Sequence, residues 1–170
     1  MRDSLIIAGT VIAAIVIGGS LYLFGTPIFH QTTTTSTAGP SGIAFATLAA
    51  GTNAAGVDQR ANYRITNAAD LATLWQMVYS NNGPSIPAVD FDTQEVLAVF
   101  DGSHSTGGYG VRISDIEDTG STRQIHITRT APADGCPAPA TLTSPFQIIA
   151  VKKSVFPLAH VDEMITTPCN

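Results

Sequence analysis

The side chains that come closest to a hydrolytic arrangement are Asp101, Ser103 and His104, which lie on one short stretch. A carboxylate, a hydroxyl and an imidazole are the groups that a serine nucleophile needs for acyl transfer. The mechanism also needs them in a chain of hydrogen bonds, and residues on a single turn rarely have that geometry. Since the sequence also lacks a G-x-S-x-G nucleophile elbow, we interpret all three as turn residues and expect no catalytic residues and no enzymatic activity.

Two other sets of side chains carry atoms that bind metals. The stretch DFDTQE, residues 90–95, holds three carboxylates, but it lacks the glycine and the spacing of a calcium loop, so we expect solvated acids at the start of a strand. The histidines stand singly at positions 30, 104, 126 and 160, with no C-x-x-C or H-x-x-x-H spacing nearby. We therefore expect no metal site, no cofactor and no small-molecule substrate.

The chain has two cysteines, Cys136 and Cys169. Outside the cytoplasm such a pair is a natural disulfide, and it would tie a loop to a C-terminus that otherwise has no expected structure. Two alternatives remain open at this point: both thiols are unpaired, or one of them pairs with another chain.

The stretch HSTGGYGVRI places Gly107 and Gly108 directly before Tyr109, although Asp101-Gly102 upstream already supplies a turn pair. In one interpretation the glycines let the backbone bulge at the start of a strand while Tyr109 packs on the core. In the other they shape a protruding loop on which Tyr109 anchors a partner. Both interpretations place His104, Ser105 and Thr106 at the exposed end of the stretch. We predict that residues 103–107 are the exposed tip and that Tyr109 is at least half buried.

The elements that must position these residues are one helix and several strands. Asn67 followed by Asp70 imitates a capping box and predicts a helix from there to about Tyr79. Its apolar residues recur at helical spacing and form one stripe toward a core: Leu71, Leu74, Trp75 and Val78.

Strands are expected at 43–51, 62–66, 95–101, 109–117, 122–130 and 145–153. The strands at 95–101 and 145–153 carry continuous apolar runs and are expected to be central. QIHITRT alternates, which predicts Ile125 and Ile127 facing inward and His126, Thr128 and Thr130 facing outward. EDTGST predicts a hairpin with positive φ at Gly120. The fold class is α+β, mostly antiparallel β, as a sandwich or partly open barrel with one packed helix.

The N-terminus predicts a membrane anchor. Residues 5–24, LIIAGTVIAAIVIGGSLYLF, hold no charge and as a helix would span roughly 30 Å, the thickness of a hydrocarbon core. A cleaved signal peptide and a buried soluble helix are the alternatives. Arg2 precedes the run and the next cation is Arg60, which favours a cytoplasmic N-terminus and an exported C-terminal region. We expect an anchor at 1–25, a Thr/Ser-rich linker at 26–42 as a flexible stalk, and an extracytoplasmic domain at 43–170.

The charge balance argues against nucleic-acid binding. The chain has 8 Lys and Arg against 13 Asp and Glu, a net charge of -5, and its cations are scattered. Nucleic-acid binding usually needs a clustered basic face.

Residues 89–153 carry a recognisable pattern. It includes Val89-Asp90-Phe91, the apolar strand ending near Phe100, Gly107-Gly108-Tyr109, the proline-rich APADGCPAP and the closing SPFQIIAVKK. With these features the chain resembles the PrcB C-terminal domain family, which is named after a subunit of a bacterial surface protease complex. The tryptophan helix looks like the usual upstream part of these proteins. The resemblance implies a shared fold and an association with a protease.

A weaker resemblance is to chagasin-type cysteine-peptidase inhibitors, which carry N-P-T-T-G-[YF]-x-W on one loop of an immunoglobulin-like barrel. Thr106, Gly108 and Tyr109 match that motif, while the inhibitors' G-x-G-G is absent. Of their R-P-W motif, Pro145 matches and Phe146 replaces the aromatic residue.

The expected function is that of a membrane-anchored, single-pass extracytoplasmic module in the cytoplasmic membrane, which docks with or assembles a surface protease. The alternative is a chagasin-like inhibitor of a secreted peptidase. The expected partner is another surface or secreted protein. The residues expected to bind it are His104, Ser105, Thr106, Gly107, Gly108, Tyr109, Pro145 and Phe146.

Overall fold

The computed structural model describes residues 36–37 and 42–169. The expected anchor at 1–25 and most of the linker at 26–42 lie outside the described residues. Among the helices that are described, none has the length and apolar character to span a membrane. The elements are β1 (Ser36–Thr37), β2 (Phe45–Gly51), β3 (Ala61–Ile65), α2 (Ala68–Tyr79), β4 (Gln94–Phe100), β5 (Gly110–Thr119), β6 (Thr122–Pro132), β7 (Phe146–Lys152) and β8 (Leu158–Thr167).

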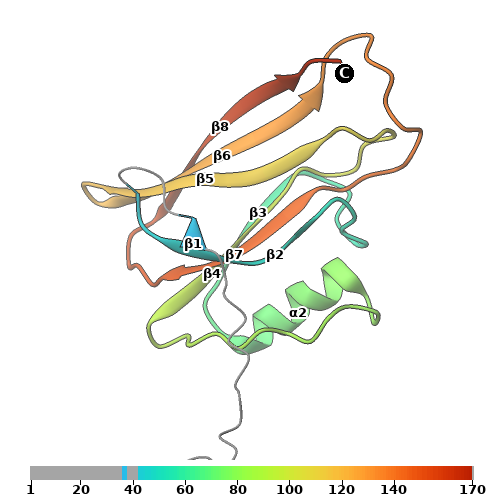
Figure 1. Cartoon of the computed structure of the whole chain (residues 1–170). Helices are drawn as coiled ribbons and strands as arrows, with labels where there is room; N and C mark the ends of the chain where they lie inside the picture. The colour runs from blue at the N-terminus through green and yellow to red at the C-terminus, as the bar shows by residue number, and fades with distance from the viewer. Residues whose placement is uncertain (1–35, 38–41, 170) are drawn as a thin grey trace, which may run out of the picture. The chain divides into compact units, whose positions relative to one another are not determined.

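The strands form two sheets. A five-stranded sheet has the order β1-β2-β7-β4-β3, and all its pairs are antiparallel. A three-stranded sheet has the order β5-β6-β8. Figure 1 shows the three-stranded sheet on one side of the larger sheet and α2 on the other. The predicted mostly antiparallel sandwich with one packed helix is therefore confirmed.

The continuous apolar runs of β4 and β7 follow from this layering, because both faces of these strands are covered. Val96 and Ala98 belong to the cluster that packs on α2, whereas Leu97 and Val99 belong to the cluster between the two sheets. β4 and β7 are adjacent and lie inside the larger sheet, as their sequence predicted.

Helix α2 begins as its sequence predicted. The Asn67 side chain accepts a hydrogen bond from the Asp70 backbone N–H at 2.9 Å, which satisfies an otherwise unpaired amide of the first turn. The helix ends where Ser80 adopts a φ of 54°. The expected stripe is buried: Leu71, Leu74, Trp75 and Val78.

The hairpin between β5 and β6 is also confirmed. Thr119 pairs with Thr122 across a two-residue loop, and Gly120 has a φ of 65°. The expected inward residues Ile125 and Ile127 are buried between the sheets. Thr128, expected on the outer face, is also buried, because it lies in the middle strand between the flanking strands β5 and β8.

Two strands were not expected from the sequence. β8 occupies the C-terminal segment and runs parallel to β6, from Arg123 opposite Leu158 to Pro132 opposite Thr167. The two-residue strand β1 falls within the expected linker and pairs with the start of β2.

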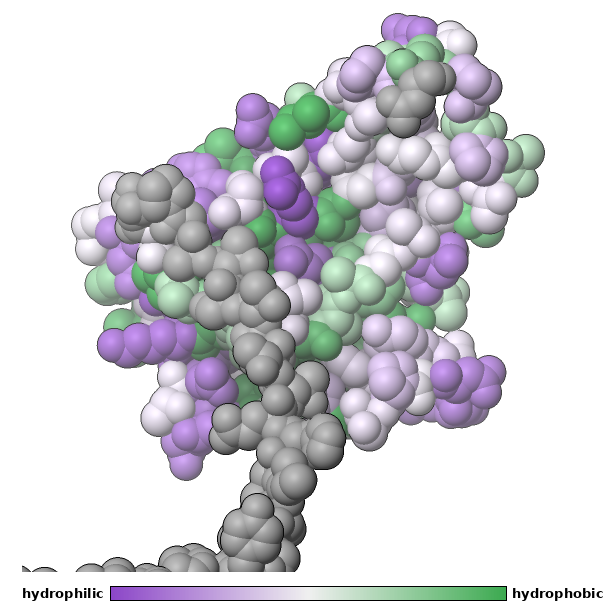
Figure 2. Space-filling model, viewed as in Figure 1, coloured by the Kyte–Doolittle hydropathy of each residue, from purple (hydrophilic) through white to green (hydrophobic). Residues whose placement is uncertain are grey.

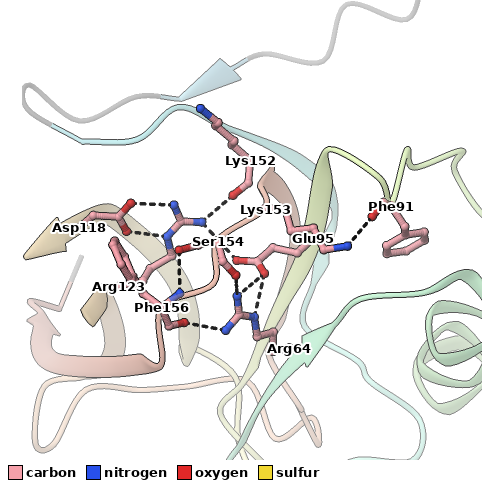
Figure 3. A network of polar contacts seen from close by, with 9 residues as sticks. All are labelled: Arg64, Phe91, Glu95, Asp118, Arg123, Lys152, Lys153, Ser154 and Phe156. Carbon is pink, nitrogen blue, oxygen red and sulfur yellow. Dashed lines mark hydrogen bonds and ion pairs between the residues drawn. The ribbon is translucent and has the colours of Figure 1, made fainter. Parts of the chain in front are cut away.

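The interpretation of Glu95 as a solvated acid is wrong. Glu95 is 0% exposed and lies between two arginines, Arg64 on β3 and Arg123 on β6 (Figure 3). Arg64 Nη2 is 2.6 Å from Glu95 Oε2, and Arg123 Nη1 is 3.2 Å from Glu95 Oε1. The carboxylate therefore joins the two sheets by a pair of charge-assisted hydrogen bonds.

The rest of this network satisfies both guanidinium groups. Arg123 forms a bidentate pair with Asp118, at 2.8 and 3.0 Å, and donates to the Lys152 carbonyl at 2.5 Å. Hydrogen bonding from Arg123 holds the pKa of the Asp118 carboxyl below its usual range. Arg64 donates to the carbonyls of Ser154 and Phe156, which fixes the connection between β7 and β8.

Candidate functional site

The predicted site residues lie on two loops that run side by side. We name residues 101–109 the glycine-tyrosine loop and residues 133–145 the proline-rich loop. His104 and Thr143 exchange backbone hydrogen bonds of 2.8 and 2.9 Å, and Gly107 N–H donates to the Pro139 carbonyl at 2.9 Å. The two loops therefore form one unit, which lies where β4 leads into β5 and β6 leads into β7.

Buried Asp101 holds this unit to the three-stranded sheet. Its carboxylate accepts a hydrogen bond from Arg129 on β6 and lies 2.8 Å from His104 Nε2. Its backbone N–H donates to the Pro145 carbonyl at 3.0 Å. Through its side chain and its backbone N–H, this one residue thus connects both loops and a strand of the second sheet.

Ser103 does not join this pair. Its hydroxyl donates to the Asp58 carboxylate at 2.9 Å, on the connection between β2 and β3. Acid, imidazole and hydroxyl therefore do not form the chain of hydrogen bonds that a serine nucleophile requires. The interpretation of Asp101, Ser103 and His104 as turn residues agrees with this geometry.

Tyr109 packs on His104. The two rings are stacked, with centroids 3.7 Å apart and planes 5° from parallel. Tyr109 is at least half buried, as expected. Gly108 has a φ of 91°, which favours glycine, at the step where the chain turns into β5. The position of Gly108 agrees with the first interpretation, in which the glycines shape the start of a strand, but Tyr109 packs on His104 and belongs to neither apolar core cluster.

The exposed tip is smaller than expected. Within residues 103–107, Ser103 and Ser105 are exposed, while Gly107 is buried against Pro139. His104 and Thr106 are partly covered because the proline-rich loop lies against them.

Two residues of the expected binding set belong to the interior. Phe146 is 3% exposed and packs against Phe100 and Tyr79, with centroids 6.1 and 5.9 Å away. Pro145 is buried, with its carbonyl bound to Asp101. The assignment of Pro145 and Phe146 to a binding surface is therefore wrong, since β7 begins at this point and its first side chains fill the core.

The cysteines form the expected intramolecular disulfide. Cys136 on the proline-rich loop is bonded to Cys169, with Cα atoms 5.2 Å apart. Figure 1 places the connection between β6 and β7 beside the end of β8, where the bridge lies. The bond therefore holds the proline-rich loop against the C-terminal strand.

A shallow pocket of about 260 Å³ lies beside the disulfide. It is lined by Gly108, Pro132 and Thr167 together with residues of the proline-rich loop and the C-terminus: Cys136, Pro137, Ala138, Pro139, Pro168 and Cys169. On the same loop Leu142 is 68% exposed. Sequence reasoning named neither the pocket nor Leu142, although the density of prolines and the nearby cysteine were visible signals.

The pocket and its surroundings suit contact with a protein. The lining is mostly apolar, and the prolines and the disulfide fix its shape before binding, which lowers the entropy cost of association. Among the described residues, no three His, Cys, Asp or Glu side chains are placed to hold a metal ion.

The comparisons with known proteins found a match to a family model. Neither the curated proteins nor the solved structures contain a match. The family model described as PrcB C-terminal matches residues 96–152, which run from β4 to β7 and include both loops of the candidate site. The resemblance seen in the sequence is therefore confirmed, because residues 96–152 of this chain match the model of the PrcB C-terminal family.

Proposed function

We propose that this chain is a non-catalytic, extracytoplasmic protein-binding module, anchored in the cytoplasmic membrane by residues 5–24, that docks with a component of a surface protease. The observation that carries the proposal is the match to the PrcB C-terminal family, whose span includes both loops. The docking surface is the exposed part of the two loops: Ser103, Ser105, Leu142 and the pocket beside the disulfide.

The geometry supports docking through exposed side chains that do not contribute to the core. Leu142 is an exposed apolar side chain on a loop held by a disulfide and by the bridge between His104 and Thr143. A rigid loop that presents an apolar side chain and also lines a pocket can provide the apolar centre of a protein interface.

A photo-crosslinking residue at position 105 or 142 of the full-length protein in its native membrane tests this proposal. The matched control is the same residue in place of Ala72, which is exposed on α2, on the far side of the larger sheet. We expect positions 105 and 142 to capture a protease subunit or substrate-binding component that position 72 does not. Equal capture at all three positions, or none, contradicts the proposed surface.

The anchor is tested separately. Protease added to intact spheroplasts is expected to remove the region from Ile43 onward and to leave residues 5–24 in the membrane. A mature protein whose N-terminus lies beyond residue 25 contradicts the anchor.

We do not carry the inhibitor hypothesis forward. It needs a protruding loop and a second aromatic loop, whereas Gly107 and Phe146 are both buried. A papain-like peptidase mixed with an equimolar amount of the protein is expected to keep its full activity, and stoichiometric inhibition would restore the hypothesis.

A further inference from the structure

The longest exposed feature of the domain is the edge strand β8. It has ten residues, and every one after Leu158 is exposed. Among the described residues no strand pairs with its outer edge, since the sheet order is β5-β6-β8. A long, exposed edge strand is a template for pairing with another chain, and proteins usually blunt such edges with lysine, proline or a bulge. β8 contains no lysine and no proline, and its pairing with β6 is regular throughout.

The backbone groups on the free edge follow from the pairing with β6. Arg123 N–H donates to the Pro157 carbonyl, and Ala133 N–H donates to the Thr167 carbonyl. Because successive residues of a strand point their N–H and C=O groups to opposite edges, the odd-numbered residues of β8 face β6. After Leu158, the residues whose backbone groups point away from the sheet are His160, Asp162, Met164 and Thr166.

The side chains of β8 define what an added strand would meet. Val161, Glu163 and Ile165 share the outer face, and both apolar members are exposed. In Figure 2 hydrophobic and hydrophilic residues are interspersed along the upper border, where Figure 1 places β8. A partner strand would therefore meet one acidic side chain, Glu163, with one apolar side chain on each side of it, Val161 and Ile165.

The inner side of the edge is also open to contact. A cavity of about 240 Å³ lies between the two sheets beside the edge strands β3 and β8, and its apolar lining includes Tyr63, Leu97, Val99, Ile125, Ile127 and Leu158. Next to it Arg60 binds Asp162 at 2.5 Å, which neutralises that carboxylate.

The charged residues of β8 indicate which kind of strand would pair with its free edge. With Asp162 paired, Glu163 is the acid of β8 that meets no cation among the described residues. A second copy of this chain is disfavoured, because the net charge is -5 and two copies of β8 would bring acidic strands together. A lysine or arginine opposite Glu163 is favoured, because opposite charges across a strand pair stabilise it.

We propose that β8 is a second docking strand, which binds an extended segment of another protein by adding it to the edge of the three-stranded sheet, and that it selects segments in which a basic residue lies between apolar residues at alternate positions. β8 lies outside the segment that matches the family, and this mode of binding does not depend on the two loops.

The test uses the full-length protein in detergent and two labelled, capped peptides, TVTKTVT and TVTETVT. We expect the lysine peptide to bind about threefold to tenfold more tightly by fluorescence anisotropy, the range expected for exchanging an attractive for a repulsive cross-strand pair. Glu163→Lys is expected to reverse the preference. In hydrogen exchange, the bound peptide is expected to protect the amides of His160, Asp162, Met164 and Thr166.

Two variants test the backbone pairing. Met164→Pro removes an N–H that points away from β6, so it is expected to abolish binding while the melting temperature changes by only a few degrees. In a bound peptide, every second backbone N–H points toward β8. Methylation of these amides is expected to block binding, whereas methylation of the amides that point away from β8 is not. The methylated peptides keep the test decisive if Met164→Pro does not fold.

The proposal is overturned if neither peptide binds at millimolar concentration, if the two bind equally, if both methylated sets bind alike, or if exchange protection falls outside β8. Leu142→Asp, which alters the proline-rich loop, is expected to leave peptide binding unchanged. Failure of loop docking and failure of strand addition are thereby distinguished.

Discussion

Replacing Glu95 by glutamine is expected to destabilise the domain strongly, although the side chain keeps its shape. The change removes the negative charge between Arg64 and Arg123, and it turns an amide N–H toward a guanidinium donor. Glu95 is 0% exposed and Arg123 is 2% exposed, so water cannot replace the lost interactions.

The size of the loss in the free energy of unfolding depends on which hydrogen bonds Arg64 and Arg123 keep in the variant. Breaking a buried ion pair by removing one partner costs about 3–5 kcal/mol. Arg123 keeps Asp118 and the Lys152 carbonyl, and Arg64 keeps two backbone carbonyls. The expected loss is therefore at the lower end, about 3 kcal/mol, which is a large part of the 5–15 kcal/mol that holds a typical domain folded.

Urea titration of wild type and variant measures this loss. With a slope of about 1–3 kcal/mol per molar, a loss of 3 kcal/mol lowers the midpoint by about 1–3 M. The matched control is Glu117→Gln, whose carboxylate is 43% exposed beside His126 and which is expected to cost at most about 1 kcal/mol. If Glu95→Gln proves as mild as Glu117→Gln, the two sheets are not held together by this carboxylate.

Three further outcomes are expected. Cys136→Ser should lower the free energy of unfolding by about 2–4 kcal/mol, and native protein should react with no thiol reagent before reduction. Gly108→Ala should cost roughly 1 kcal/mol or more in urea titration because φ is positive; Gly120→Ala, where nothing lies within 4 Å of the added Cβ, measures the backbone term alone. Because Arg123 lowers the pKa of Asp118, the stability that this pair contributes is present above pH 3.8, the ordinary value, and is lost as the pH falls through the lower folded value; Asp118→Asn should flatten the pH dependence below pH 4.

The parts of the fold that could be predicted are those whose signal is local. Asn67 and Asp70 are three residues apart and specify the start of α2 by themselves. β4 and β7 have apolar runs because both faces are buried, so their central place could be inferred without knowing their neighbours.

The errors at Glu95 and Phe146 have a common physical cause. Glu95 precedes an apolar run and resembles a solvated residue at a strand end, but its partners Arg64 and Arg123 are 31 and 28 residues away in the chain. Phe146 was assigned to a surface by likeness to inhibitor loops, although an aromatic residue that opens a central strand belongs to the core. Both residues are buried because of contacts with residues far away in the chain, and such contacts cannot be predicted from the local sequence pattern.

β8 was missed for a related reason. Its residues are nearly all exposed, so it lacks the alternation of buried and exposed positions that identifies a strand. It forms because β6 offers a free edge and because both of its ends are held.

The way those ends are held connects the fold to both proposed surfaces. Before β8, Arg64 fixes the carbonyls of Ser154 and Phe156, and after it the disulfide fixes Cys169 to the proline-rich loop. A strand fixed at both ends needs little further ordering when another strand is added, so less binding energy is lost to entropy. The same disulfide also orders the pocket beside the glycine-tyrosine loop. Reduction of one bond is therefore expected to weaken loop docking and strand addition together, even though the two surfaces share no partner contact.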